Sequence, residues 1–322
     1  MTSADWSWTR GRSRSWQQSW QDDQVSSSSS HWDSSPWQSQ LGWKTWRGKE
    51  PQNWSRGTAE NWKTQASTDD SWKRLEQPWY IDVHDLALHP PDHRFTIVVL
   101  HSCSGGPDDS LAFFHQLPEL RQTARVVVPC APIRTEQDAG WDRKQNSWFH
   151  YDMESGDGNS VKDKAQLEEQ SARILSILEE ERERLPDKDG GRMILWGLSQ
   201  GVGLALHVAL RASFSLGAVI ALRGMALPED ADTLMPWQQH RGDQRPLEVL
   251  ASNGGRDTMC PPDLARLTYE ALVRYGVSMT YVSDPTLAHA CARGRQCLSR
   301  QECLDVSAFL QRIWGGMACD GR

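Results

Sequence analysis

The stretch Met193-Ile-Leu-Trp-Gly-Leu-Ser-Gln-Gly201 decides the fold of this 322-residue chain. Its first four residues form an apolar run, as in a parallel strand buried on both faces. A GxSxG pattern follows, and an apolar helical pattern begins at Gly201. The small residues around Ser199 permit a sharp strand-to-helix turn that exposes the hydroxyl group, and the helix N-terminus favours nearby negative charge. A glycine-rich connection with an incidental serine is the alternative interpretation.

Strand and helix patterns alternate along much of the chain. Strands are predicted over Thr96–His101, Arg125–Pro129, Met193–Trp196, Ala218–Leu222, Leu247–Ala251 and, as an edge strand, Ser278–Val282. Helices are predicted over Asp108–Arg121, Val161–Arg184, Gly201–Ala212, Pro261–Tyr275 and Gln301–Trp314. This alternation predicts an α/β fold with a mainly parallel central sheet and helices on both faces. Functional residues are expected at the carboxyl ends of its strands.

The first 77 residues differ from the rest in composition. Twelve of the 17 Trp lie at or before Trp79, among Ser, Gln, Asp and Arg with hardly any Val, Ile or Leu. Such a segment cannot bury enough apolar surface to offset the entropy lost on ordering. We therefore predict a disordered low-complexity tail over residues 1–77, a folded domain over residues 78–316 and a short C-terminal tail over residues 317–322.

Charge and cysteine usage limit the classes of function. The net charge is −7, and the residues after position 77 contribute 25 Lys and Arg against 33 Asp and Glu, so the folded domain argues against nucleic-acid binding. The seven Cys are scattered without CxxC pairs, which favours a reducing compartment and indicates neither disulfides nor a structural zinc. No signal-peptide core or membrane-spanning run occurs, so we expect a cytoplasmic protein without an integral membrane segment. The Arg- and Ser-rich start leaves an organelle transit peptide open.

Ser199 needs a base to take its proton and an acid to orient that base, because a serine hydroxyl is a weak nucleophile at neutral pH. In a fold of this type the two partners follow the serine in the chain, acid first, each on a loop after a strand. Asp257 and His289 occupy such loops, and no other His follows His240. We predict that Ser199, Asp257 and His289 form a catalytic triad.

Other residues compete for these roles. Asp284 is a rival acid, but it lies five residues before His289 and precedes a proline, which favours a turn. His207 falls inside a predicted helix and His240 in a polar connection, so both are interpreted as packing or surface residues.

An acyl transfer also needs hydrogen-bond donors for the oxyanion, usually the backbone N–H after the nucleophile and one from an earlier loop. Gln200 supplies the first. Cys103 is the candidate for the second, and Ser102 or Ser104 replaces it if the register differs. A Cys103 nucleophile paired with His101 is the obvious competitor, but it would leave the triad residues unexplained.

No metal ligand set or cofactor motif is predicted. The spacing of Cys291, Cys297 and Cys303 matches no known ligand spacing, and His150-Tyr-Asp152 is interpreted as an ordinary loop segment.

Five short segments together resemble the acyl-protein thioesterase family, the phospholipase/carboxylesterase branch of the α/β-hydrolases, over about residues 94 to 315. They are Ile97–His101, Ala131–Arg134 with Ser147-Trp-Phe149, Gly197–Gly201, Gly254–Pro261, and His289 followed by Gln301–Val306. The resemblance implies a cofactor-independent, monomeric or weakly dimeric cytosolic enzyme. Its substrates would be acyl thioesters on proteins, lysophospholipids or small esters. It also implies a substrate-binding role for Trp148.

The chain departs from the family pattern in two places near the expected site. The family has a glycine-containing loop where His101-Ser-Cys-Ser104 stands, which adds a Cβ where backbone must approach the oxyanion. Arg223, Gly224 and Met225 replace apolar residues that border an acyl channel, so Arg223 and Met225 are expected to contact substrate. An arginine at the channel mouth favours a shorter or anionic acyl group. An Arg-rich insertion, about Ala292–Arg300, has no family counterpart.

An alternative from a different class is a catalytically silent hydrolase-like scaffold whose Trp-rich tail mediates binding. The altered loop at residues 101–106 is its only support. Interleaved Trp and Arg in the tail are compatible with stacking on single-stranded nucleic acid or with self-association, and its near-zero net charge favours a passive extension.

Overall fold

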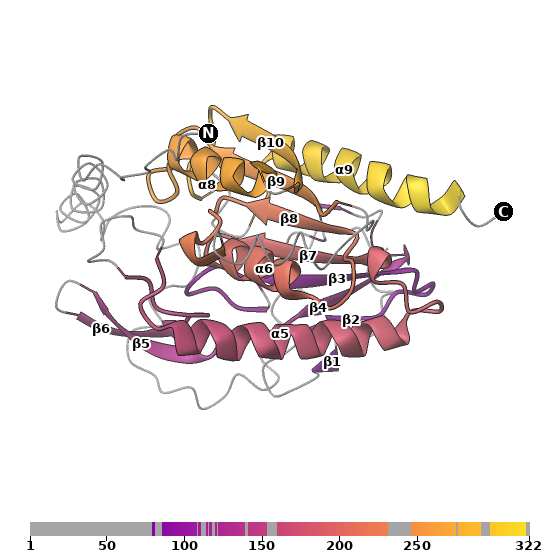
Figure 1. Cartoon of the computed structure of the whole chain (residues 1–322), viewed down its shortest axis with the longest axis horizontal. Coiled ribbons are helices and arrows are strands. Elements are labelled where there is room, and N and C mark those ends of the chain that lie inside the picture. Colours follow the sequence, from indigo (N-terminus) through magenta and orange to yellow (C-terminus); the bar gives the residue numbers. More distant parts are fainter. Residues whose placement is uncertain are drawn as a thin grey trace, which may run out of the picture. The chain divides into compact units, whose positions relative to one another are not determined.

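A mainly parallel sheet forms the centre of the structure (Figure 1). The structure is a computed structural model and describes residues 79–80, 86–107, 109–110, 114, 116–117, 120, 122–138, 141–152, 160–230, 246–274, 276–290 and 297–319. The predicted tail over residues 1–77 lies outside this part. Within it the sheet has eight strands in the order β1-β2-β4-β3-β7-β8-β9-β10.

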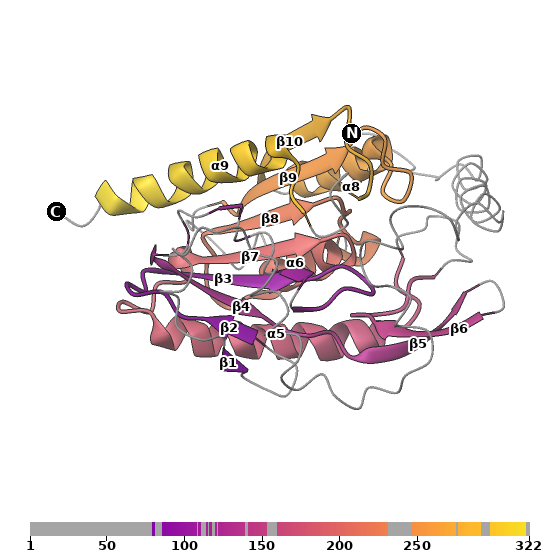
Figure 2. The ribbon, with the colours of Figure 1, turned by 180° about the vertical axis from the view of Figure 1, so that it is seen from behind.

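The strands are β1 (Trp79–Tyr80), β2 (Leu86–Leu88), β3 (Phe95–Leu100), β4 (Ala124–Val128), β7 (Met193–Leu198), β8 (Ala218–Leu222), β9 (Glu248–Gly254) and β10 (Ser278–Asp284). The six strands from β4 to β10 pair in parallel, whereas β1 and β2 add antiparallel pairs at one edge. All six predicted strands are confirmed, and β10 is the edge strand that the sequence predicts. The parallel strands point in the same direction, so their carboxyl ends lie along one side of the sheet (Figure 2).

Helices cover both faces of this sheet (Figures 1 and 2). They are α5 (Lys164–Arg184), α6 (Gln200–Arg211), α8 (Pro262–Arg274) and α9 (Arg300–Cys319), with 3₁₀ turns η5 (Gly190–Arg192) and η6 (Pro228–Asp230). All four α-helices were predicted within a few residues, but α9 extends to Cys319, into the residues assigned to a C-terminal tail. Most of the predicted helix Asp108–Arg121 lies outside the described residues.

The core explains why the central strands are continuous apolar runs. On the α9 face, alternate residues of β3 and β7, among them Ile97, Val99, Ile194 and Trp196, pack with Phe309 and other apolar residues of α9. The intervening residues of the same strands are equally buried, because helices cover the other face. A strand buried on both faces has no polar position to alternate with.

A two-stranded antiparallel hairpin, β5 (Ile133–Asp138) with β6 (Trp141–Asn146), is a separate sheet that the sequence did not predict. Its strands are rich in polar and charged residues, so neither carries the apolar run of a core strand. The hairpin matters for function because Asn146 and the residues after it lie against the loop that follows β3.

No helix in the described part of the chain is long and apolar enough to cross a membrane.

Candidate active site

Ser199 lies in a sharp turn between β7 and α6, as the sequence predicts. Its backbone has φ 53° and ψ −117°, a left-handed conformation that L residues rarely adopt. The neighbouring glycines make this turn possible. A Cβ at Gly197 would lie 2.5 Å from the carbonyl oxygen of Gly201, and one at Gly201 would lie 2.1 Å from that of Leu100. The turn therefore requires glycine at both positions.

The Ser199 side chain is directed to His289. Ser199 occupies the N-cap position of α6, where a serine commonly accepts a hydrogen bond from the first turn. Here the side chain makes no capping bond, and its Oγ lies 2.9 Å from Nε2 of His289. The hydroxyl group is thus held for interaction with the imidazole.

Asp257 holds the other side of the imidazole ring. Its Oδ2 lies 2.9 Å from Nδ1 of His289, and its Oδ1 accepts hydrogen bonds from the backbone N–H groups of Met259 and Cys260, at 2.9 and 2.8 Å. A carboxylate is an acceptor only, so Nδ1 carries the ring proton and Nε2 presents its lone pair to Ser199. The structure therefore brings Ser199, His289 and Asp257 together in one hydrogen-bonded chain.

The rival acid Asp284 has other partners. Its Oδ1 accepts from the backbone N–H and the hydroxyl of Thr286, at 2.9 and 2.7 Å, and its Oδ2 accepts from Ser299. The hydrogen bond from the Thr286 hydroxyl group contributes most to lowering the pKa of Asp284. This carboxylate stabilises the turn before His289, as the following proline indicated, and the ring of His289 contacts Asp257 instead.

The thiol of Cys260 lies beside these three hydrogen-bonded residues. Within the described residues, Asp257, Cys260 and His289 form the one group of three possible metal ligands whose donor atoms lie within 4.8 Å of one another. Burial, and then the charge of Asp257, raise the pKa of the Cys260 thiol well above its usual range. The thiol therefore keeps its proton at neutral pH, and a metal would have to displace both that proton and the hydrogen bond between Asp257 and His289.

His101 fixes the start of the loop that follows β3. It is fully buried, and its Nε2 accepts a hydrogen bond of 2.9 Å from the backbone N–H of Ala131. Nδ1 must then carry the ring proton, and it donates to the carbonyl of Ser102 at 2.8 Å. Both ring nitrogens are thereby used, so His101 has no nitrogen left to serve Cys103 as a base.

Cys103, the candidate second oxyanion donor, lies in the loop after β3, which contacts the β6 strand of the hairpin. Its Sγ accepts a hydrogen bond of 3.2 Å from Nε2 of Gln145. The next residue, Ser104, has φ 62° and donates its N–H to the carbonyl of Asn146 at 2.7 Å. In this loop, the residue with a left-handed backbone is therefore Ser104.

The side chain of Gln200 organises the loop after β6. Its Oε1 accepts from the backbone N–H of Trp148 at 2.9 Å, and its Nε2 donates to the carbonyl of Phe149 at 2.6 Å. The Trp148 indole N–H donates to the carbonyl of His101 at 2.8 Å. These contacts link the turn at Ser199 to the loop after β3. No sequence pattern indicated them, because the partners are far apart in the chain.

The three residues predicted to contact substrate are all buried. Trp148 and Arg223 are fully buried, and Met225 is 5% exposed. For Trp148 and Met225, contact with substrate stays a prediction, because burial alone does not decide whether a side chain borders the acyl group. The expectation of an arginine charge at a channel mouth is wrong, because the Arg223 guanidinium forms a buried ion pair with Glu302. Arg223 gives no reason for a short or anionic acyl group.

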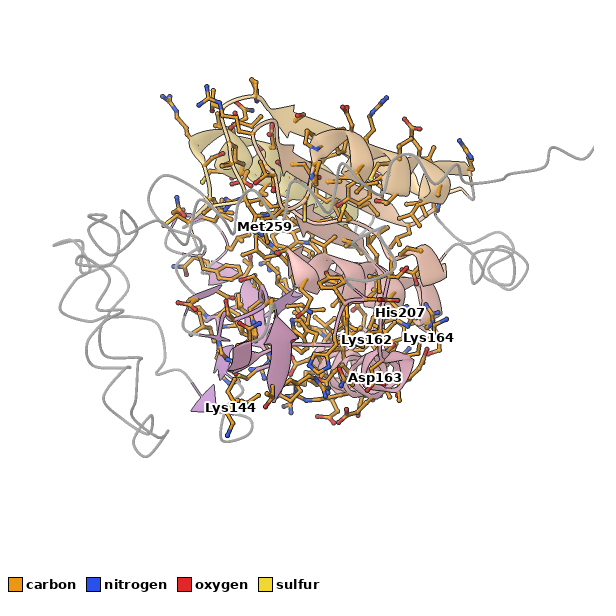
Figure 3. All side chains as sticks on the ribbon, turned by 90° about the vertical axis from the view of Figure 1, so that its left-hand side faces the viewer. Lys144, Lys162, Asp163, Lys164, His207 and Met259 are labelled. Atoms are coloured by element: carbon orange, nitrogen blue, oxygen red, sulfur yellow. The ribbon has the colours of Figure 1, made fainter. Side chains whose placement is uncertain are left out.

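His207 lies away from this site, as the sequence predicts. Its Nδ1 lies 2.7 Å from Oδ1 of Asp230, which also accepts from Arg211 at 3.0 Å. Figure 3 shows His207 near the start of α5 and well separated from Met259, which marks the loop carrying Asp257. The contacts of His207 and Arg211 with Asp230 thus join α6 to η6. His240, Cys291 and the predicted insertion up to residue 296 lie outside the described residues.

The sheet order, the strained turn at Ser199 and the His and Asp on later loops define the α/β-hydrolase fold. The family model of phospholipases and carboxylesterases matches residues 90–297, and the chain belongs to this family. The family resemblance drawn from the short motifs is thereby confirmed.

Solved structures show the same fold. SOBER1 from Arabidopsis thaliana has a TM-score of 0.57 and 20% identity, and the match covers 69% of this chain and 99% of that one. Acyl-protein thioesterase 2 from Zea mays has a TM-score of 0.55 and 17% identity, covering 71% and 98%. A Bacillus cereus carboxylesterase has a TM-score of 0.51 and 14% identity, covering 76% and 97%.

Proposed function

We propose that this chain is a serine hydrolase that cleaves carboxylic esters or thioesters through an acyl-enzyme intermediate. Ser199 is the nucleophile, His289 the general base and Asp257 the acid that orients the base. The observation that carries this proposal is the hydrogen-bonded chain from Ser199 Oγ through the His289 ring to Asp257 Oδ2, with 2.9 Å at each step. Membership of the phospholipase/carboxylesterase family supports the reaction class.

The proton follows this chain during the reaction. As Ser199 Oγ attacks the substrate carbonyl carbon, its proton passes to Nε2 of His289, and Asp257 stabilises the resulting imidazolium. When the tetrahedral intermediate collapses, Nε2 gives the proton to the leaving alkoxide or thiolate, and an ester of Ser199 remains. Water then enters, gives its proton to His289 and releases the carboxylic acid by the reverse sequence.

The negative charge on the carbonyl oxygen requires donors that are already oriented. The backbone N–H of Gln200 is one, because the first N–H groups of a helix have no partner within the helix. The backbone of Cys103, in the loop fixed by His101, is the proposed second donor. The N-terminus of α6 adds a favourable dipole next to Ser199.

The substrate classes are an acyl thioester on a protein, a lysophospholipid or a small ester. The family description and the name of the maize thioesterase support this range. We propose a monomeric or weakly dimeric cytoplasmic enzyme. Because Arg223 is buried in an ion pair, the acyl chain preference must be measured and does not follow from that residue.

A fluorophosphonate probe tests the proposal directly. Wild-type protein should gain one covalent adduct on Ser199, detected by intact-mass and peptide spectrometry, and Ser199→Ala should gain none. A folded wild type that is neither labelled nor active on short p-nitrophenyl esters would overturn the proposal in favour of the silent scaffold. p-Nitrophenyl and thio esters of increasing chain length, assayed with and without residues 1–77, then define the acyl group and the contribution of the tail.

A further inference from the structure

Arg223 occupies an unusual position directly after β8. Its backbone is left-handed, with φ 54°, and its N–H donates to the carbonyl of Ser252 at 2.7 Å. The side chain is fully buried and binds Glu302 with two hydrogen bonds, Nε to Oε1 at 2.8 Å and Nη2 to Oε2. Glu302 is also buried. Two opposite charges have thus been removed from water a short distance from the proposed base.

The same guanidinium group also contacts two backbone carbonyl groups, those of His289 and Cys297. Nη1 donates to the carbonyl of His289 at 3.5 Å, and Nη2 donates to the carbonyl of Cys297 at 2.7 Å. One planar cation therefore connects the end of β8, the backbone of the base and the approach to α9. The planar fork of arginine suits several simultaneous acceptors, which a lysine ammonium does not match in geometry.

Glu302 also fixes the start of α9. Its Oε2 accepts from the backbone N–H of Ser299 at 2.7 Å, and the Ser299 hydroxyl accepts from the backbone N–H of Glu302 at 3.1 Å. This reciprocal pair is a capping box at the helix N-terminus. The carboxylate that neutralises Arg223 is therefore held in place by a helix that itself packs on the sheet.

We propose that Arg223 and Glu302 are positioning residues for His289. Asp257 orients the imidazole ring, whereas the ion pair holds the backbone that carries it. This inference rests on the proposed function, because a base must lie within hydrogen-bond reach of its nucleophile. A displacement of about 1 Å in a catalytic group can lower the rate by about 10²-fold. Without Arg223 the backbone carbonyls of His289 and Cys297 lose the cation that both contact.

The chain offers a matched control. Arg125 and Glu181 form a second buried pair with the same two-point geometry, Nε to Oε2 at 2.6 Å and Nη2 to Oε1 at 3.0 Å. This pair joins β4 to α5, and the hydrogen bonds of Arg125 to Glu181 and His89 involve none of the three triad residues. Arg125→Met leaves the buried Glu181 carboxylate without this arginine, so the control should disturb the fold at least as much as removal of both charges at Arg223 and Glu302.

The test compares three proteins: Arg125→Met, Arg223→Lys and the double variant Arg223→Met/Glu302→Gln. The double variant removes both charges of the pair, while glutamine keeps an acceptor for the capping box. After correction for the folded fraction, we expect kcat of the double variant to fall about 10- to 100-fold with little change in KM. Arg223→Lys should be intermediate, and Arg125→Met should keep the wild-type kcat.

A spectroscopic readout makes the test independent of turnover. The Nδ1 proton of His289, held by Asp257, should give a low-field proton NMR signal in the wild type that is absent from His289→Ala. It should be broadened or lost in the double variant and preserved in Arg125→Met. A double variant with wild-type kcat and an unchanged signal would overturn the inference. A wild type that shows the signal but has no esterase activity and no labelling of Ser199 would overturn the proposed function alone.

Discussion

The Oγ of Ser199 lies 2.9 Å from Nε2 of His289, although 90 positions separate the two residues in the chain. Each follows a strand of the same sheet, β7 and β10, and the parallel strands end at one edge. The contact is within the range for direct proton transfer. The backbone therefore needs no rearrangement for His289 to act as the base.

Ser199→Ala and His289→Ala should each lower kcat for ester hydrolysis by about 10³- to 10⁶-fold. The double variant should be little worse than either, because nucleophile and base act as one unit. The measurement is single-turnover and steady-state kinetics on a p-nitrophenyl ester, with circular dichroism as the control for folding. Multiplicative losses in the double variant would contradict the assignment.

Asp257→Asn should lower kcat by about 10⁴-fold and leave KM nearly unchanged, because the amide no longer selects the required tautomer of His289. Asp284→Asn is the matched control, and its effect on kcat should be small, since Asp284 bonds to Thr286 and Ser299. The reverse ranking of the two variants would transfer the acid role to Asp284.

Asp284 should instead contribute to stability in a pH-dependent way. Its pKa is lowered in the folded protein, mainly by the hydrogen bond from the Thr286 hydroxyl. Such a carboxylate stabilises the fold above its unfolded pKa, and this contribution is lost as the pH falls through the lower folded value. Urea denaturation should therefore find wild type more stable than Asp284→Asn at pH 6, with the difference shrinking below about pH 4. A difference that grows on acidification would refute this explanation.

Gln200→Ala should separate the structural role of the Gln200 side chain from the proposed oxyanion-binding role of its backbone N–H. The change leaves the buried Trp148 N–H without its partner, whereas the Phe149 carbonyl keeps the hydrogen bond from the Ser147 hydroxyl, so the expected cost is about 1–3 kcal/mol in unfolding free energy. The backbone N–H beside Ser199 remains, so kcat per folded molecule should fall far less than in Ser199→Ala. Gln166→Ala, which loses comparable bonds to His150, is the control for stability. A stable Gln200→Ala protein without activity would contradict this separation.

Ser104→Gly should stabilise the protein by about 1 kcal/mol, because glycine adopts the left-handed conformation of this residue without steric cost. Ser102→Gly is the matched control. Ser102 has no positive φ, so glycine there only increases the entropy of the unfolded chain and should destabilise slightly. Thermal unfolding of both variants gives the comparison, and the opposite order would show that the strain of this loop lies elsewhere.

The central strands and the turn at Ser199 could be predicted from sequence because their signals are local. A strand buried on both faces is apolar at most of its positions, and the turn at Ser199 needs glycine on either side. The β5–β6 hairpin was missed for the complementary reason. Its strands are polar and are held by main-chain hydrogen bonds to each other, so they leave no apolar pattern.

The identities of Ser199, Asp257 and His289 as candidates followed from residue types and their order along the strands. The environment of Arg223 did not. A charged residue at a strand end is ordinarily solvated, and only its partner, 79 positions away, shows that this one is buried. Sequence alone thus determined which core strands and helices form and which chemical groups stand at their ends, because backbone conformation and apolar periodicity are encoded locally. Tertiary structure decided which of those groups are exposed to a substrate and which support the site, because burial and pairing depend on segments that the chain brings together only when it folds.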